Sequence, residues 1–205
     1  MQNGARLSRP DTEQSFGCTR RMISFRMKVR AISSTAEIDD LERAIVASAD
    51  STVGDLRTLF AATNGIEFLA QLKFRKAGRD PLSARPLNLI EQVNQTFTYL
   101  ASCDALRYLI AHHADRVPFV IHLGTAAGPD IESTDRSIVA EVFAATHPGS
   151  NQKLLKDLRK LRACAPAAHR YLFYSCPGEH RVQISQLQPE VTVVALGLWT
   201  RCITG

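Results

Sequence analysis

The sequence predicts an α/β protein with a central mixed β-sheet flanked by helices. Two observations carry this prediction. Apolar residues recur at helical spacing through much of the first half of the chain and again near residue 155, and short runs rich in β-branched and aromatic residues follow these segments. With 205 residues, of which 45% are hydrophobic and 22% charged, the chain has the size of one domain, with or without an appended piece.

The first 33 residues show no sustained periodicity and predict a basic, flexible leader, with a short strand expected over residues 22–32. Residues 1–30 contain seven basic and two acidic side chains, and this excess equals the net charge of +5 of the whole chain. Such a leader is either a solvated extension or an arm that contacts nucleic-acid phosphates.

Residues 34–85 predict an N-terminal helical segment that ends in a linker. A first helix is expected over residues 34–49, because a serine-threonine pair can cap its free amides and acidic residues follow in its first turn. A second helix is expected over residues 50–63, because Asn64-Gly65 is a helix stop.

The next two segments complete this N-terminal part. Residues 66–74 are short and apolar, which fits either a strand or a third helix. Residues 76–86 are rich in Gly, Pro, Arg and Asp and predict a linker. The main α/β domain is therefore expected over residues 86–205.

The main domain is predicted to alternate helices and strands. Helices are expected over residues 87–113, 151–162 and 179–187. Strands are expected over residues 117–123, 130–134, 137–145, 170–175 and 191–198, and the last of these runs is expected to be buried. Asp104 is expected to divide the first helix, and Ser150 or Asn151 to cap the second. His122 is expected to be a hydrogen-bonded core histidine.

The expected location is the cytoplasm, without membrane insertion. No stretch approaches the about 18 consecutive apolar residues of a transmembrane helix, and the first residues lack the apolar run of a signal peptide. The five cysteines lie at least 12 residues apart, which excludes a CxxC metal knuckle and argues against a disulfide framework.

Two acidic residues carry the most specific chemistry in the sequence. Asp130 follows Pro129 at the start of one predicted strand, and Glu141 lies inside the apolar run of the next, where a charge is costly. If these strands pair as a hairpin, both carboxylates converge, and a divalent cation is a partner that would explain both. The structural alternative is that Asp130 caps a turn and that Glu141 reaches solvent at a sheet edge.

The order of the elements, together with Pro129-Asp130 and Glu141-Val142-Phe143, resembles the PD-(D/E)xK nuclease superfamily, which has a restriction-endonuclease-like fold. The resemblance covers about residues 87–176 and implies a core of order α-β-β-β-α-β, preceded here by the N-terminal helical segment. It also implies metal-dependent hydrolysis of phosphodiester bonds in DNA, and members of the superfamily often act as homodimers.

The resemblance implies a Mg²⁺ or Mn²⁺ ion held by Asp130 and Glu141, with the Val142 carbonyl as a possible third oxygen ligand. Such an ion lowers the pKa of a bound water and offsets charge on the scissile phosphate. Glu91, in the helix before the first strand of the core, is a candidate further ligand. Its alternative is a solvent-facing position on that helix.

The sequence departs from the superfamily at Phe143, where the motif has a lysine that orients or activates the attacking water. Lys153, in the first turn of the next predicted helix, is the candidate replacement. The alternative is an inactive site on a nuclease-fold module that only binds nucleic acid or a partner.

The predicted helix after Glu141 is strongly basic. Its face is either solvated or in contact with nucleic-acid phosphates. The candidate phosphate-binding residues are Lys153, Lys156, Arg159 and Lys160.

Overall fold

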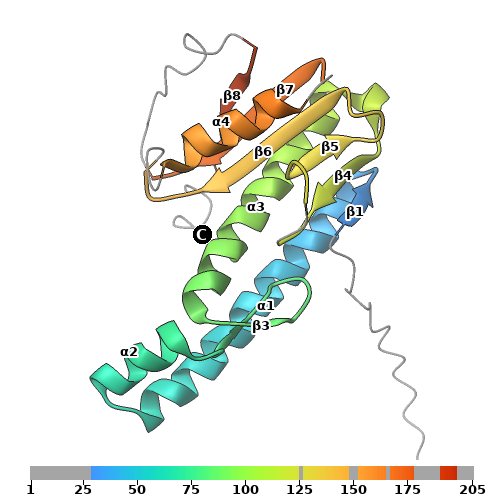
Figure 1. Ribbon diagram of the computed structural model, residues 1–205. Helices are drawn as coiled ribbons and strands as arrows, with labels where there is room; N and C mark the ends of the chain where they lie inside the picture. The colour runs from blue at the N-terminus through green and yellow to red at the C-terminus, as the bar shows by residue number, and fades with distance from the viewer. Residues whose placement is uncertain (1–28, 125–126, 148–151, 165–166, 178–189, 198–205) are drawn as a thin grey trace, which may run out of the picture.

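The computed structural model describes residues 29–124, 127–147, 152–164, 167–177 and 190–197 (Figure 1). Their central feature is a six-stranded mixed sheet with helices on both faces, so the predicted α/β class and mixed sheet are confirmed. Residues 1–28 of the expected leader, the expected helix over residues 179–187 and the expected caps Ser150 and Asn151 lie outside the described residues. No helix of the described part is both long and apolar enough to cross a membrane.

The six strands lie in the order β1-β4-β5-β6-β7-β8. Their bounds are β1 Val29–Ile32, β4 Phe119–His122, β5 Ile131–Ser133, β6 Ile138–Ala144, β7 His169–Ser175 and β8 Thr192–Ala195. The neighbours from β1 to β6 are antiparallel, whereas β6, β7 and β8 are parallel. The parallel connection from β6 to β7 passes through helix α4, which spans Lys153–Ala163.

Strand β1 lies within the short strand expected over residues 22–32, but the expectation placed that strand in a flexible leader and not in the sheet. It pairs with β4 through all four of its residues, from Val29 with His122 to Ile32 with Phe119. Ile32 is fully buried, so this short strand closes one edge of the sheet and its last side chain enters the core.

The N-terminal helices also differ from the expectation. Helix α1 spans Thr35–Ala62 without a break, and helix α2 spans Gly65–Phe74, which settles the strand-or-helix choice for this segment. The predicted start of a second helix near Asp50 is wrong. Asp50 is exposed on the helix surface, while Thr52 is buried and its hydroxyl donates to the Ser48 carbonyl within the same helix.

Helix α3 spans Leu89–His112 and is followed by a short 3-10 turn over Ala114–Arg116. The predicted break at Asp104 is wrong, because α3 continues through this residue. The Asp104 carboxylate accepts from Arg107 along the helix surface. The segment predicted as a linker forms a small ribbon of strands β2 Gly78–Arg79 and β3 Pro86–Leu87. The Asp80 carboxylate is buried in its turn, where it accepts from the backbone N–H groups of Leu82 and Ser83.

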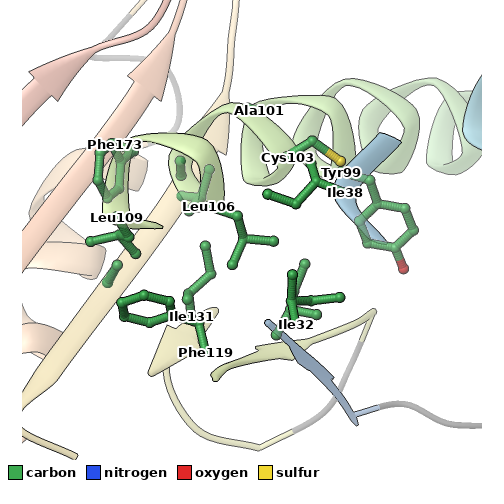
Figure 2. Packing of buried hydrophobic residues seen from close by; sticks show 14 of the residues in the cluster. Ile32, Ile38, Tyr99, Ala101, Cys103, Leu106, Leu109, Phe119, Ile131 and Phe173 are labelled. Atoms are coloured by element: carbon green, nitrogen blue, oxygen red, sulfur yellow. The ribbon is translucent and has the colours of Figure 1, made fainter. Parts of the chain in front are cut away.

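One face of the sheet packs against α1 and α3 (Figure 2). Ile32 and Ile38, from the N-terminal part, lie in the same buried cluster as Leu106 of α3 and Phe119 and Ile131 of the sheet. The core therefore extends across the boundary expected at residue 86.

The opposite face packs against α4, where Leu158 and Leu161 contact a second buried cluster of the sheet. Along β6, alternate side chains enter the two clusters: Val142 lies in the α3 cluster, whereas Val139 and Phe143 lie in the α4 cluster. The same alternation places the intervening Glu141 on the α4 face. Strand β8, expected to be buried, is the edge strand and leaves Thr192 and Ala195 exposed.

Candidate active site

The site lies where strands β5 and β6 separate. Their pairing ends with Ile131 opposite Ala140, while β6 continues beside β7 as far as Ala144. Asp130 occupies the gap. Its Oδ2 accepts from the Val142 backbone N–H at 2.8 Å, and its carbonyl accepts from the His122 N–H at 2.8 Å. These two hydrogen bonds fix the residue at the opening between the strands.

Glu141 lies next to this opening, beneath α4, and is only 1% exposed. Lys160 of α4 donates from Nζ to its Oε2 at 2.9 Å, and among the described residues nothing hydrogen-bonds to its buried Oε1. Burial and the negative charge of Asp130 raise the pKa of Glu141 to about 8, against the opposing effect of Lys160. The structure therefore brings the two predicted carboxylates together, and Glu141 Oε1 has no hydrogen-bond partner among the described residues.

Asp157 of α4 is a third buried carboxylate in this cluster, with no exposed surface. Its Oδ1 accepts from Lys153 Nζ at 2.9 Å and lies 4.0 Å from Lys160 Nζ. Burial raises the pKa of Asp157 in spite of both lysines, and within the described part of the chain its Oδ2 has no hydrogen-bond partner. Burial alone would lower the pKa of Lys160, but its hydrogen bond to Glu141 and the surrounding carboxylates raise it.

A cavity of about 290 Å³ opens in front of these charges. It is lined by residues of α3 on one side, of α4 on the other, and of the strand ends and loop between them. These are Asn94, Gln95, Thr98, Tyr99, Ser102, His122, Gly124, Gly128, Asp130, Val142, Lys153 and Lys160. Residues of both helix layers therefore line one cavity at the opening between β5 and β6.

His122 lines this cavity and is held from two sides. Its Nε2 lies 3.2 Å from Glu132 Oε1, which matches the expected hydrogen-bonded histidine. Gly128 covers the ring with a φ of +111°, and a Cβ at that position would lie 3.3 Å from the His122 ring. Glycine is therefore required here both by the backbone conformation and by the close approach.

The contacts of Lys153 and Lys160 with the carboxylates differ from the roles that the sequence indicated. Lys153, expected to replace the motif lysine, lines the cavity but makes its ion pair with Asp157. Lys160, expected only to contact nucleic acid, reaches Glu141 directly. Lys156 and Arg159, the other expected phosphate-binding residues, are exposed on α4.

Phe143 is 2% exposed and belongs to the cluster beneath α4. It lies two residues after Glu141 and therefore on the same face of β6. The Phe143 ring packs near Tyr174, with ring centroids 6.0 Å apart, so the third position of the expected motif carries an apolar side chain within this cluster. An ammonium group enters this face from the helix instead of from the strand.

Glu91 is not brought to the carboxylates, in contrast to its expected role as a further metal ligand. It is exposed in the first turn of α3, where its Oε2 accepts from the Asn88 backbone N–H at 3.4 Å and its own N–H donates to Asn88 Oδ1 at 2.8 Å. This capping box turns its carboxylate back toward the helix start. Gln95, one turn later, lines the cavity, and its Oε1 is buried without a partner in the described structure.

Asp157 is the site residue that sequence reasoning missed. A signal for it exists in the helical stripe of Leu154, Leu158 and Leu161, because a residue three positions after Leu154 lies on the buried side of that stripe. An acid at this position, with lysines four residues before and three after it, can pair with both.

The donor set can supply part of a divalent-cation site. Across the described residues, no group of three or more His, Cys, Asp or Glu side chains is arranged to hold a metal ion. Asp130 and Glu141 provide two carboxylates, and Glu141 Oε1 is a buried acceptor without a partner. Mg²⁺ is often bound by one or two carboxylates and completes its shell with water and substrate oxygens. The two carboxylates fit that mode of binding.

Comparison of the chain with known protein families, with curated proteins and with solved structures found no match.

Proposed function

We propose that the protein hydrolyses phosphodiester bonds in DNA with Mg²⁺ or Mn²⁺, as a nuclease built on a restriction-endonuclease-like core. The observation that carries the proposal is the meeting of Asp130, Glu141 and Lys160 at the opening between β5 and β6. The element order α3-β4-β5-β6-α4-β7, with β6 and β7 parallel, supports it, since this order is the one that the resemblance implies.

Asp130 and Glu141 would hold the cation, which supplies a bound water of lowered pKa and offsets phosphate charge. The Val142 N–H keeps one Asp130 oxygen in place, so the orientation of this carboxylate is set before any ligand arrives. The buried Glu141 Oε1 has no hydrogen-bond partner among the described residues, so a bound cation would satisfy it. In this proposal the chain provides a preformed pair of oxygen ligands.

Lys160 takes the role that the motif lysine has in the superfamily. Its Nζ is already 2.9 Å from Glu141 and lines the cavity, so it can donate to a water or phosphate oxygen beside that carboxylate. Lys153 lines the same cavity and adds a second ammonium group. The lysine function expected of Lys153 is thus assigned first to Lys160.

The balance of charges supports a requirement for a cation. Above the pKa of about 8 of Glu141, the three carboxylates of Asp130, Glu141 and Asp157 exceed the two ammonium groups of Lys153 and Lys160 by one negative charge, which disfavours a phosphate. One divalent cation converts this into one positive charge, which complements a single phosphodiester. DNA binding in the cavity is therefore expected to depend on the metal.

A second candidate function is a catalytically inactive nuclease-fold module that binds nucleic acid or a partner. Phe143 favours this alternative, because it removes the lysine from its usual strand position. The exposed Lys156 and Arg159 would then contact phosphates without cleavage.

The test is cleavage of supercoiled plasmid and of single-stranded DNA with Mg²⁺ or Mn²⁺, together with calorimetric titration of Mn²⁺. Asp130→Ala and Glu141→Ala are expected to lose both cleavage and Mn²⁺ binding. Lys160→Ala is expected to bind Mn²⁺ and to cleave about 10²- to 10³-fold more slowly, the usual effect of removing one group that stabilises transition-state charge. Lys153→Ala is expected to lower the cleavage rate less than Lys160→Ala does.

Asp50→Asn and Lys73→Ala are matched controls, because they change the same kinds of charge at exposed positions of α1 and α2. Cleavage that survives Asp130→Ala would place the activity elsewhere. A wild-type protein that binds Mn²⁺ and DNA but cleaves neither substrate would favour the inactive module.

A further inference from the structure

Asp157 has no part in the proposed chemistry, although it is the most deeply buried charge of the site. Its side chain is 1% exposed, and it faces Lys153 and Lys160, whose side chains are 40% and 53% exposed. A buried ion pair of this kind is weak evidence for stability, because taking the charges out of water costs about as much as their attraction returns. Its position between the two lysines therefore points to a different role.

We propose that Asp157 is a positioning residue that holds Lys153 and Lys160 over the Asp130–Glu141 pair, so that both ammonium groups face the same anionic oxygen of the substrate. This inference rests on the proposed function. It extends the proposed function by giving Lys153 a defined position and by assigning to Asp157 a role that it performs only through the two lysines.

Helix geometry supports the assignment. Lys153 and Lys160 lie four residues before and three residues after Asp157, so all three side chains share one face of α4. Lysine side chains this exposed have high rotamer entropy and would otherwise extend into water. The Lys153 Nζ instead lies 2.9 Å from Asp157 Oδ1, and the Lys160 Nζ lies 4.0 Å from the same oxygen and 2.9 Å from Glu141 Oε2.

The charges around the lysines support it too. Two ammonium groups directed into one cavity repel each other, and the carboxylate between them offsets that repulsion. The negative charge of Asp157 also repels those of Asp130 and Glu141. A neutral side chain at this position would remove the hydrogen bond that holds Lys153 and the nearby charge that attracts Lys160, while both proposed metal ligands would stay in place.

The test compares wild type with Asp157→Asn, which keeps the shape and removes the charge, and with Asp157→Glu. In Mn²⁺-loaded protein, Asp157→Asn is expected to lower kcat on single-stranded DNA by about 10- to 100-fold, as removal of an orienting partner commonly does. Its KM and its Mn²⁺ affinity are expected to stay within about threefold of wild type. Asp157→Glu is expected to restore part of kcat.

A second readout does not need activity. Reductive methylation, read residue by residue by mass spectrometry, measures how freely each lysine amine reacts. In Asp157→Asn, Lys153 is expected to react at least about threefold faster relative to Lys156, because its charge-assisted hydrogen bond to Asp157 is lost. Lys160 keeps its hydrogen bond to Glu141 and is expected to change less. Circular dichroism and thermal unfolding check that the variant is folded.

The outcomes separate the two proposals. Unchanged methylation of both lysines in a folded Asp157→Asn would overturn the positioning role, and so would wild-type kcat. Loss of Mn²⁺ affinity in proportion to kcat would also overturn it, by making Asp157 a ligand. Faster methylation in Asp157→Asn, with a wild-type protein that cleaves nothing, would support the placement of the lysines and overturn the proposed nuclease.

Discussion

Glu141 combines burial with a neighbouring negative charge, and both act against its ionised form. In the folded protein its pKa is about 8, compared with 4.5 for an unperturbed glutamate. Between these two values the folded chain keeps a proton that the unfolded chain has released. A metal ion bound to Glu141 therefore has to displace this proton at neutral pH, and metal affinity is expected to rise with pH up to about 8.

The shift predicts a pH-dependent stability for the metal-free protein. Because the folded pKa is raised, the stability associated with protonated Glu141 is fully present below about pH 4.5 and is lost as the pH rises through about 8. Urea unfolding of wild type and Glu141→Gln should show the wild type losing stability relative to the variant between about pH 5 and about pH 8, and levelling above that. Asp50→Asn serves as the exposed control, and a pH-independent difference for Glu141→Gln would contradict the assignment.

At the scale of elements, Gln92 joins three segments that the sequence pattern left separate. It is 2% exposed on α3. Its Nε2 donates to the Thr52 hydroxyl of α1 at 2.6 Å, and its Oε1 accepts from the Arg79 backbone N–H of β2 at 2.8 Å. Gly78 is required beside it, because a Cβ there would lie 2.5 Å from Gln92 Oε1. The amide thus fixes α1 and the β2–β3 ribbon to the helix that lines the cavity.

Gln92→Ala is expected to lower the free energy of unfolding by about 1–3 kcal/mol, because the Arg79 N–H loses its partner in a nearly closed environment. Denaturant unfolding measures this change. Thr96→Ala is the matched control, since the Thr96 hydroxyl donates only to the Gln92 carbonyl of its own helix in the described structure. A loss of unfolding free energy no larger than that of Thr96→Ala would show that the Gln92 side-chain hydrogen bonds contribute little to stability.

At the scale of the whole molecule, the end of α1 and helix α2 form a hairpin that projects away from the sheet (Figure 1). Helix α2 has no buried residue, and large apolar side chains are exposed on this hairpin. They are Phe60, Ile66, Leu69 and Phe74. We propose that a second copy of the chain covers this apolar hairpin, because several large apolar side chains are exposed on it and because, under the proposed function, two sites are needed to cut both strands of a duplex.

The double substitution Ile66→Ser and Phe74→Ser removes two side chains that are 79% and 75% exposed. It is expected to weaken self-association at least about tenfold, as loss of buried interface anchors does, and to convert double-strand cleavage into nicking. Sedimentation velocity measures the association, and Ile90→Ser, an exposed apolar position on α3, is the control. A wild-type protein that is monomeric at micromolar concentration would contradict the dimer.

Local patterns in the sequence determined most of the secondary structure and the proximity of Asp130 to Glu141. The alternation of side chains along residues 138–144 defines which of them face each helix layer. Because β5 is short and forms a hairpin with β6, the residue before β5 lies near the middle of β6. The apolar spacing of α4 identified Leu158 and Leu161 as buried, whereas in α3 the apolar residues Ile90 and Val93 are exposed. These features depend only on neighbours in the chain, so they can be read from it.

The tertiary structure decided everything that depends on contacts between layers. It joined residues 29–32 to the sheet, assigned Lys160 and not Lys153 to Glu141, and buried Asp157 between the two lysines. It also left Glu91 in a helix cap, away from the cavity. The physical reason is that the reach of a side chain across two elements depends on their packing distance and on the rotation of each helix about its axis, and neither quantity is encoded in a local periodicity.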